Sequence, residues 1–414
     1  METGEFTRGC GILLSISSLP SPYGIGTMGE AAFRFIDLLT DLKQKYWQVL
    51  PIGPTSYGDS PYQPLSSCAG NIYFIDLDKL VADGLLSTDE IRCFNWGSDD
   101  TEIDYAVLFT NRKKILQKAF ERFDINAQEF CDFKKENSNW LGDYSLFMAL
   151  KNDNLNKNWT EWPQEFKTRH YNEISFWEFC QYEFFKQWAE MKQYADSRGI
   201  QIIGDVSFFV GLDSADVWAD PSQFLIDANG KPSVVAAAVP DKFSEAGQIW
   251  GNPMYDWKQM ETDGFEWWRQ RIRIRKKQFD IIRIDHFIGM VKDYTVLSEA
   301  ESALSGKWVK GPGKKLADAL KTELGDTRVI ADDYTGAALL PGVRKLLSKT
   351  GWMGTKVLMF AFDGNTANEH LPHNYVNSQV AVYCGTHDNE TIVGTFRDKT
   401  EYELAYLYQY LNIS

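Results

Sequence analysis

The sequence predicts an α/β protein, a (β/α)8-type TIM barrel with helical insertions. Short apolar runs rich in β-forming residues alternate with longer stretches of helical periodicity, which is typical of parallel strands joined by crossovers. The chain has 414 residues, whereas such a barrel needs about 250, so there is room for sizeable insertions. We expect seven runs to form barrel strands, at residues 10–16, 46–52, 201–206, 280–285, 328–332, 355–360 and 379–384.

The first two runs lie in a segment, residues 1–75, that we expect to supply two barrel strands and loops of the active site. After the second run the chain continues as GPTSYGDSPYQP, rich in turn-forming residues. Functional loops of such barrels follow the C-terminal ends of the strands. This loop is therefore a place where a ligand could approach.

The rest of the chain divides into two further segments. Residues 76–199 are polar and aromatic with helical patterning, as in WEFCQYEFFKQWAEMKQYADSRG, and are predicted to be a mainly helical insertion. Residues 200–414 contain the other five runs and, we expect, the catalytic residues. No eighth run follows Asp388, so the barrel is predicted to be truncated before its last strand, which would leave strand edges exposed.

Composition excludes some classes of partner. The net charge of −14 opposes binding to nucleic acids or anionic membranes, because phosphate-rich partners attract basic surfaces. Aromatic residues make up 14% of the chain, and flat rings pack well against the apolar faces of sugars. A large aromatic core would explain the same composition.

Cysteine usage and the N-terminal sequence bear on the compartment. The six cysteines lack the short paired spacing of a zinc cluster or a disulfide framework. The start, METGEFTRGCGILLSISSLP, has no basic region followed by a long apolar stretch, and no run of eighteen apolar residues occurs. We expect a cytoplasmic protein.

The run FDIIRIDHFIGM contains the clearest candidate for chemistry. Its apolar strand delivers Arg283 and Asp285 to one end, and residues two apart on a strand face the same side. A neighbouring guanidinium favours the ionised carboxylate, which is the state that a nucleophile needs. A structural Arg–Asp pair at a strand end is the alternative.

Polar residues follow two other runs. His387, Asp388 and Asn389 come directly after an apolar strand, which is costly unless these groups bind something or one another. A turn cap is the alternative for this cluster. Asp332 and Asp333 follow another run, where successive side chains alternate, so we expect one of them to face the barrel mouth. Two helix N-caps are the alternative there.

These strand ends match the needs of glycoside cleavage. Cleavage with retention uses two carboxyl groups about 5 to 5.5 Å apart, one ionised for attack and one protonated to release the leaving oxygen. The sequence contains no phosphate-binding loop, dinucleotide turn, serine-nucleophile elbow or metal-spaced histidine cluster. Carbohydrate chemistry is therefore predicted, with no metal or organic cofactor required.

Several stretches resemble one known family: GILLSISSLPSPYGIGTMGE, DSPYQPLSSCAGN, GDVSFFVGLDSADVWAD, FSEAGQIWGNPMYDW, RIDHF, PHNY and GTHDNET. The chain resembles the amylomaltases, the bacterial 4-α-glucanotransferases or disproportionating enzymes of glycoside hydrolase family 77. The resemblance implies a barrel enzyme that acts on α-1,4-glucans and maltooligosaccharides. It also implies that Asp285 is the nucleophile, Arg283 its charge partner, and that His387 and Asp388 bind hydroxyls of the transferred sugar.

The same resemblance assigns residues outside the strand ends. Asp205, in GDVSFF, matches a further strand-end acid of the family. Tyr62, in SPYQ, and Trp257, in GNPMYDW, are implied to shape the glucan-binding cleft, with Asn389 beside the sugar.

The chain departs from the family at the acid/base. The family has Glu in an Ala-Glu-Asp-Leu-Gly-type run, whereas this chain has Asp332 in the sequence ADDYT. Aspartate is one methylene shorter, and a misplacement of about 1 Å can cost roughly a hundredfold in rate. Family members also continue farther beyond the His-Asp-Asn motif.

We therefore expect a retaining 4-α-glucanotransferase. The alternatives are an amylase-like α-glucan hydrolase with the same groups, and a catalytically impaired glucan-binding remnant, because of Asp332 and the missing strand. Transfer requires that a sugar outcompete water, and the aromatic loops around Tyr62 and residues 250–257 are where we expect water to be excluded.

Overall fold

The computed structural model describes residues 8–99, 101–163, 171–240, 244–332 and 340–413. Within them a parallel sheet has the order β1-β2-β3-β6-β9, and a parallel pair, β10-β11, continues it. An isolated parallel bridge between Ile330 and Met353 joins the two parts. The strands are β1 (Gly11–Leu13), β2 (Tyr46–Gln48), β3 (Gln201–Val206), β6 (Ile281–Ile284), β9 (Arg328–Ala331), β10 (Gly354–Val357) and β11 (Val380–Tyr383).

Each of the seven predicted runs contains a strand, in sequence order and parallel. The predicted bounds were too long at β1, β2 and β10, where the strands end at Leu13, Gln48 and Val357 and a 3-10 helix, Leu358–Phe360, follows the last of them. The centre of the sheet is buried: every residue of β6 is buried, and Trp47 and Ile202 are fully enclosed. Such strands, covered on both faces, are read from sequence as continuous apolar runs. Among the described residues after β11 no further parallel strand occurs.

Helices surround this sheet. They contact one another in the order α1, α7, α10, α11, α12, which is the outer ring of a barrel. Their bounds are α1 (Glu30–Asp41), α7 (Tyr171–Ser197), α10 (Glu266–Gln278), α11 (Lys314–Leu324) and α12 (Leu340–Thr350).

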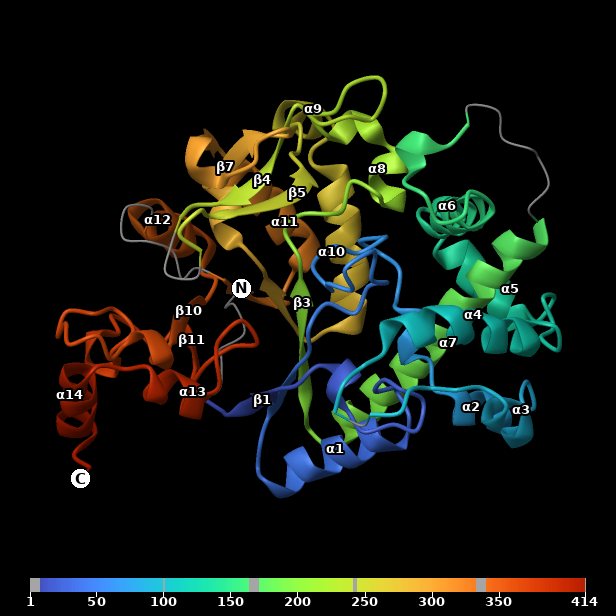
Figure 1. Cartoon of the computed structure of the whole chain (residues 1–414), viewed down its shortest axis with the longest axis horizontal. Helices are drawn as coiled ribbons and strands as arrows, with labels where there is room; N and C mark the ends of the chain where they lie inside the picture. The colour runs from blue at the N-terminus through green and yellow to red at the C-terminus, as the bar shows by residue number, and fades with distance from the viewer. Residues whose placement is uncertain (1–7, 100, 164–170, 241–243, 333–339, 414) are drawn as a thin grey trace.

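A group of helices fills the chain between β2 and β3. In Figure 1 it lies on one side of the barrel, with α7 at its centre, where α4, α5 and α6 contact α7. Phe123, Phe130, Phe179 and Tyr182 form an aromatic cluster there. The other helices of the group are α2 (Leu77–Ala82), α3 (Thr88–Arg92), α4 (Tyr105–Phe120), α5 (Gln128–Glu136) and α6 (Leu141–Asp153).

A second sheet was not predicted. It is antiparallel, with the order β5-β4-β7-β8, and is built from the two stretches that flank β6 in sequence. In Figure 1 it lies above β3, together with α9. The elements are α8 (Ala215–Ala219), β4 (Val234–Ala238), β5 (Gln248–Pro253), α9 (Trp257–Thr262), β7 (Lys292–Leu297) and β8 (Lys307–Lys310).

The last described part of the chain forms a small separate core. Ala361, Phe362, Leu371 and Leu407 are buried together, and α13 (Ile392–Arg397) and α14 (Glu401–Leu411) follow β11. Figure 1 places these two helices opposite the α2–α7 group. In the part of the chain that the structure describes, no helix is both long enough and apolar enough to span a membrane.

Candidate active site

The ends of three neighbouring strands bring charged side chains together. β6 lies between β3 and β9, and in this register Asp205 stands beside Arg283, while Asp332 follows β9. Asp285 follows β6 directly, so Arg283 and Asp285 leave the strand on the same face. The four side chains meet at the C-terminal end of the sheet, where the active sites of such barrels lie.

Arg283 is the centre of this cluster. Its side chain is 3% exposed, and Nη1 donates to Asp205 Oδ2 at 2.6 Å and to Asp285 Oδ1 at 3.1 Å. Nη2 lies 2.8 Å from Asp332 Oδ2, an ion pair without hydrogen-bond geometry. Buried charges are costly unless paired, so one guanidinium and three carboxyl groups stabilise one another. The predicted contact of Arg283 with Asp285 is confirmed.

The two candidate catalytic carboxyls differ in their environment. Burial raises the pKa of Asp285 and the pKa of Asp332, and Arg283 acts against that shift in both. The Asp285 side chain is 24% exposed and accepts a hydrogen bond from Arg283, whereas Asp332 is 9% exposed. Water reaches Asp285 more readily than Asp332, but burial raises the pKa of Asp285 well above its ordinary value, so both carboxyl groups bind a proton more readily than exposed aspartates do.

Tyr62 joins the loop after β2 to this cluster. Its hydroxyl donates to Asp205 Oδ2 at 2.9 Å and lies 2.7 Å from His387 Nε2. Burial raises the pKa of the Tyr62 hydroxyl, which keeps its single proton in place. Since that proton is given to Asp205, His387 Nε2 must donate to the Tyr62 oxygen. The Tyr62 and His387 rings are also stacked, with centroids 5.4 Å apart.

The turn after β11 carries the other predicted residues. His387 Nε2 lies 3.3 Å from Asp388 Oδ1, and the Asp388 side chain is 59% exposed. Asp388 is therefore connected to Arg283 through His387, Tyr62 and Asp205. Asn389 Oδ1 accepts hydrogen bonds from the backbone N–H and hydroxyl of Thr386, at 2.8 and 3.1 Å. This is the turn cap that was the alternative for the cluster.

Aromatic rings lie beside the cluster. The Trp250 ring makes an edge contact with His286 at 4.9 Å, and the Trp250 carbonyl accepts from Gln63. Trp257 is one ring farther away: it packs against Phe208, which contacts His286. The structure therefore places Trp250, rather than Trp257, directly beside the strand-end residues.

One of the two aspartates at positions 332 and 333 was predicted to face the barrel mouth. Asp332 does so, in contact with Arg283 and, at 3.4 Å, with the backbone N–H of His286. These contacts differ from the helix N-cap that was the alternative. Asp333 lies outside the described residues.

Two pairs near the site were missed from the sequence. Tyr383, at the end of β11, donates to Gln48 of β2 at 2.6 Å, across the barrel interior. His286 Nε2 lies 3.5 Å from Asp293 Oδ1. Gln48 and Asp293 are buried polar residues within strands, and a polar residue inside an apolar run was the signal that could have found Gln48.

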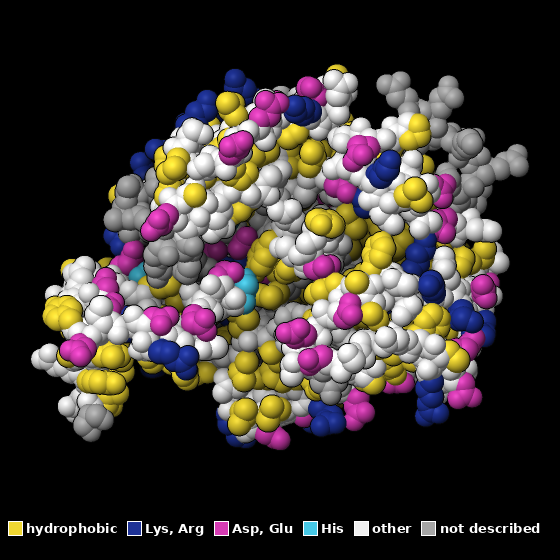
Figure 2. Space-filling view, viewed as in Figure 1, with side chains coloured by type: hydrophobic (Ala, Val, Ile, Leu, Met, Phe, Trp, Pro, Cys, Tyr) yellow, Lys and Arg dark blue, Asp and Glu magenta, His cyan; other side chains and the backbone are white. Residues whose placement is uncertain are grey.

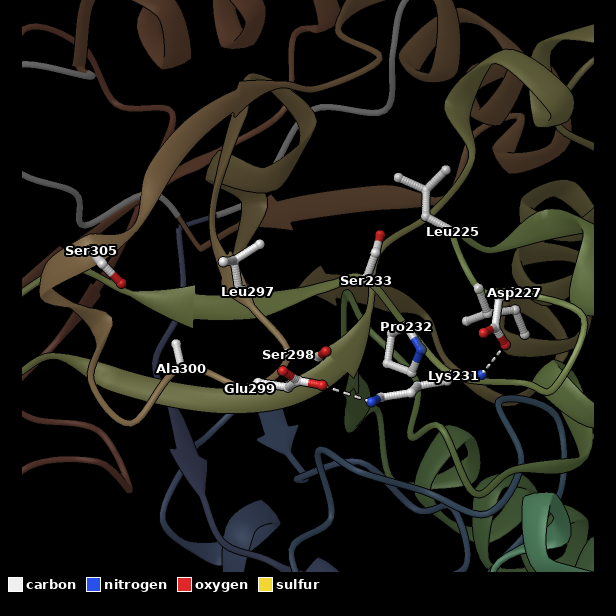
Figure 3. Close-up of a pocket in the computed structure, with 11 residues that line it drawn as sticks. Leu225, Asp227, Lys231, Pro232, Ser233, Leu297, Ser298, Glu299, Ala300 and Ser305 are labelled. Carbon is white, nitrogen blue, oxygen red and sulfur yellow. Dashed lines mark hydrogen bonds and ion pairs between the residues drawn. The ribbon is translucent and has the colours of Figure 1, made fainter.

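The surface agrees with a site at the strand ends. Figure 2 shows acidic side chains and histidine at the hollow in the middle of the visible face. A separate hollow of about 700 Å³ lies on the antiparallel sheet, lined by Leu225, Lys231, Leu297 and Glu299 among others (Figure 3). It contains none of the predicted site residues. Among the described residues no group of His, Cys, Asp and Glu could hold a metal ion.

A parallel barrel that gathers carboxyl groups, an arginine and a histidine at its strand ends has the groups that barrel enzymes use to cleave glycosidic bonds. The model of the glycoside hydrolase family 77 enzymes, described as 4-alpha-glucanotransferase, matches residues 14–414. The chain belongs to this family.

Individual relatives agree. The 4-alpha-glucanotransferase of Clostridium butyricum is 44% identical, over 95% of this chain and 84% of that protein. That of Thermus thermophilus is 41% identical, over 98% and 83%. The solved amylomaltase from Streptococcus agalactiae in complex with acarbose superposes with a TM-score of 0.93 at 38% identity, over 99% of this chain and 85% of that one. The predicted family and TIM-barrel fold class are confirmed.

Proposed function

We propose that this protein is a 4-α-glucanotransferase that moves α-1,4-glucan segments to the 4-hydroxyl of an acceptor glucan or glucose, with retention. The observation that carries this proposal is that one buried side chain, Arg283, contacts three carboxyl groups, those of Asp205, Asp285 and Asp332. It combines, at one barrel mouth, a carboxylate for attack and a carboxyl group that can hold a proton.

In the first half-reaction an Asp285 carboxylate oxygen attacks the anomeric carbon. The glycosidic C–O bond breaks, its electron pair stays on the leaving oxygen, and that oxygen takes the proton of Asp332. In the second half-reaction the acceptor 4-hydroxyl gives its proton to Asp332 and displaces Asp285. Two inversions at one carbon give overall retention.

The remaining residues bind and orient the sugar. Arg283 favours the ionised form of Asp285, and Asp205 fixes Arg283 and Tyr62. His387 and Asp388 bind hydroxyls of the transferred sugar, with Asn389 holding their turn. Tyr62 and Trp250 border the site, with Trp257 behind them, and favour transfer by excluding water from the intermediate.

The proposal is tested with maltotriose as the sole substrate. Transfer yields glucose together with maltopentaose and longer chains, whereas hydrolysis yields only glucose and maltose. Separation of products over time distinguishes the two. Absence of any chain longer than maltotriose, while glucose is released, would show a hydrolase. Absence of both products would support the impaired glucan-binding protein that Asp332 suggests.

We also propose the three-segment organisation, 1–75, 76–199 and 200–414, and a cytoplasmic location. Helices α2 to α7 all lie within the middle segment. All six cysteines are free, which fits a reducing compartment. Cell fractionation against cytoplasmic markers tests the location. Limited proteolysis tests the segments, with first cuts expected near their boundaries.

A further inference from the structure

Gln48 is a buried polar residue on the inner face of the barrel. Its neighbour Trp47 packs against Phe35 of α1, so the side chain of Gln48 points the other way, into the interior. The strand β2 is paired on both sides, and Gln48 lies beside Leu13 of β1 and Ile203 of β3. Gln48 is 3% exposed, and a buried amide is costly unless it is hydrogen-bonded.

The partner of Gln48 lies on β11. The Tyr383 hydroxyl donates to Gln48 Oε1 at 2.6 Å. Burial raises the pKa of this hydroxyl, against the effect of Arg283, so the hydroxyl keeps its proton. Asp205 and Asp332 also raise this pKa, and such electrostatic effects fall with distance. The contact therefore belongs to the polar interior next to the charged strand ends.

The end of β11 has few other fixed neighbours. Among the described strands β11 pairs with β10 alone, and its residues are half-buried or exposed. Two side-chain hydrogen bonds connect its end to β2 and to the loop after β2. One joins Tyr383 to Gln48. The other joins His387, in the turn after β11, to Tyr62.

We propose that Tyr383, held by Gln48, is a positioning residue for the transfer reaction. Their hydrogen bond fixes the end of β11 to a strand that is paired on both sides. It thereby determines where His387 and Asp388 lie at the barrel mouth. This inference rests on the proposed function, in which His387 and Asp388 bind hydroxyls of the transferred sugar.

The first test separates positioning from stability. Tyr383→Phe removes one hydroxyl and is expected to lower kcat/KM for maltotriose roughly threefold to tenfold, the value of one hydrogen bond. It also leaves Gln48 Oε1 buried without this partner, which lowers the melting temperature. Gln48→Met removes that oxygen, so the double variant is expected to recover stability but not transfer. Recovery of transfer together with stability would show that the pair serves the fold only.

Gln48→Met alone is expected to lower kcat/KM by a similar factor, and it provides the same test should Tyr383→Phe fail to fold. The matched control is Tyr294→Phe in the antiparallel sheet. The Tyr294 hydroxyl is also buried and donates to the carbonyl of Ala303 at 2.9 Å. Its loss is expected to lower the melting temperature and leave kcat/KM at the parent level. If Tyr294→Phe impairs transfer as much as Tyr383→Phe does, the inference is wrong.

The second readout does not depend on activity. Nitrogen-15 shifts of the histidine rings report which ring nitrogen carries the proton, and the spectrum of His387→Gln identifies the His387 signals among five histidines. At a pH of about 8, where free imidazole is neutral, the parent is expected to show His387 protonated at Nε2, which donates to Tyr62. Tyr383→Phe is expected to give a mixture of tautomers, and Tyr294→Phe the parent spectrum.

The two readouts distinguish the positioning from the proposed function. A chain that lacks transferase activity but shows this pattern of tautomers contradicts the proposed function and not the positioning. An unchanged His387 tautomer in Tyr383→Phe contradicts the positioning.

Discussion

The end of β6 and the turn after β11 carry similar residues in different surroundings. Arg283 on β6 has a hydrogen-bonded strand on each side, and its side chain is 3% exposed. β11 pairs with β10 among the described strands, Val382 is 46% exposed and Asp388 59% exposed. Breaking a buried ion pair costs about 3–5 kcal/mol, whereas exposed pairs contribute about 0–1 kcal/mol. Neighbouring strands, rather than residue type, therefore bury the first cluster and make its ion pairs strong.

The largest effect is expected from Asp285→Asn, which should reduce transfer below detection. An amide cannot form the covalent intermediate, although its size preserves the fold. Asp280→Asn, at the opposite end of the same strand, is the control and should retain activity. Transfer by Asp285→Asn at the parent rate would remove Asp285 from the mechanism.

Arg283→Lys tests whether the β6 cluster depends on one guanidinium. Lysine cannot present Nη1 and Nη2 to three carboxyl groups at once, so the free energy of unfolding should fall by about 3–5 kcal/mol, and transfer should fall with it. Urea unfolding measures the first effect and the maltotriose assay the second. If the free energy of unfolding falls by less than about 1 kcal/mol, the ion pairs of Arg283 are no stronger than exposed ones, which would contradict the comparison.

Glu183 on α7 sharpens the comparison, because it is buried without such an arginine. Its side chain is 1% exposed, and neither oxygen has a hydrogen-bond partner among the described residues, although Lys186 Nζ lies 3.8 Å from Oε2. Burial raises the pKa of Glu183 from 4.5 to about 7. The folded state thus binds a proton that the unfolded state loses above pH 4.5. Stability from this group is present below that pH and is lost as the pH rises through about 7.

Glu183→Gln should therefore stabilise the protein at pH 8, by up to about 3 kcal/mol, and have little effect at pH 4.5. Urea unfolding at the two pH values measures this difference. Equal effects at both would show that Glu183 does not titrate as its burial indicates.

Asp332→Glu restores the side-chain length of the family acid/base. Transfer is expected to rise roughly tenfold if reach is the defect, and Asp332→Ala should abolish it. Initial rates with maltotriose measure both changes. If neither variant differs from the parent, another carboxyl group supplies the proton.

The smallest effect is expected from Asn389→Ala in the exposed turn. The loss of its hydrogen bonds to Thr386 should cost about 1 kcal/mol. Thermal unfolding tests this value, and KM for maltotriose shows whether the turn also orients His387 and Asp388. A loss as large as that of Arg283→Lys would contradict the difference between the regions.

Part of the fold and site could be predicted from the sequence alone. Buried parallel strands are continuous apolar runs, so all seven were found. Arg283 and Asp285 are two residues apart, which determines that they share a face. The family motifs supplied Asp205, Tyr62 and His387, which the structure joins through hydrogen bonds.

The remainder depended on contacts between distant segments. The antiparallel sheet is assembled from two separate stretches on either side of β6. Neither stretch has a sequence pattern that indicates with which other segment it pairs. The contact of His286 with Asp293 depends on a left-handed turn and on glycine at 289. The Tyr383–Gln48 contact joins residues 335 positions apart.

The sequence by itself determined where along the chain each strand of the parallel sheet lies and which of its residues share a face, because the alternation of side chains is a local property of the backbone. Only the tertiary structure decided that Arg283 contacts three carboxyl groups and that Asp388 remains exposed. Burial and charge pairing depend on which strands become neighbours, and the environment of an ionisable group is the sum of contacts from all of them.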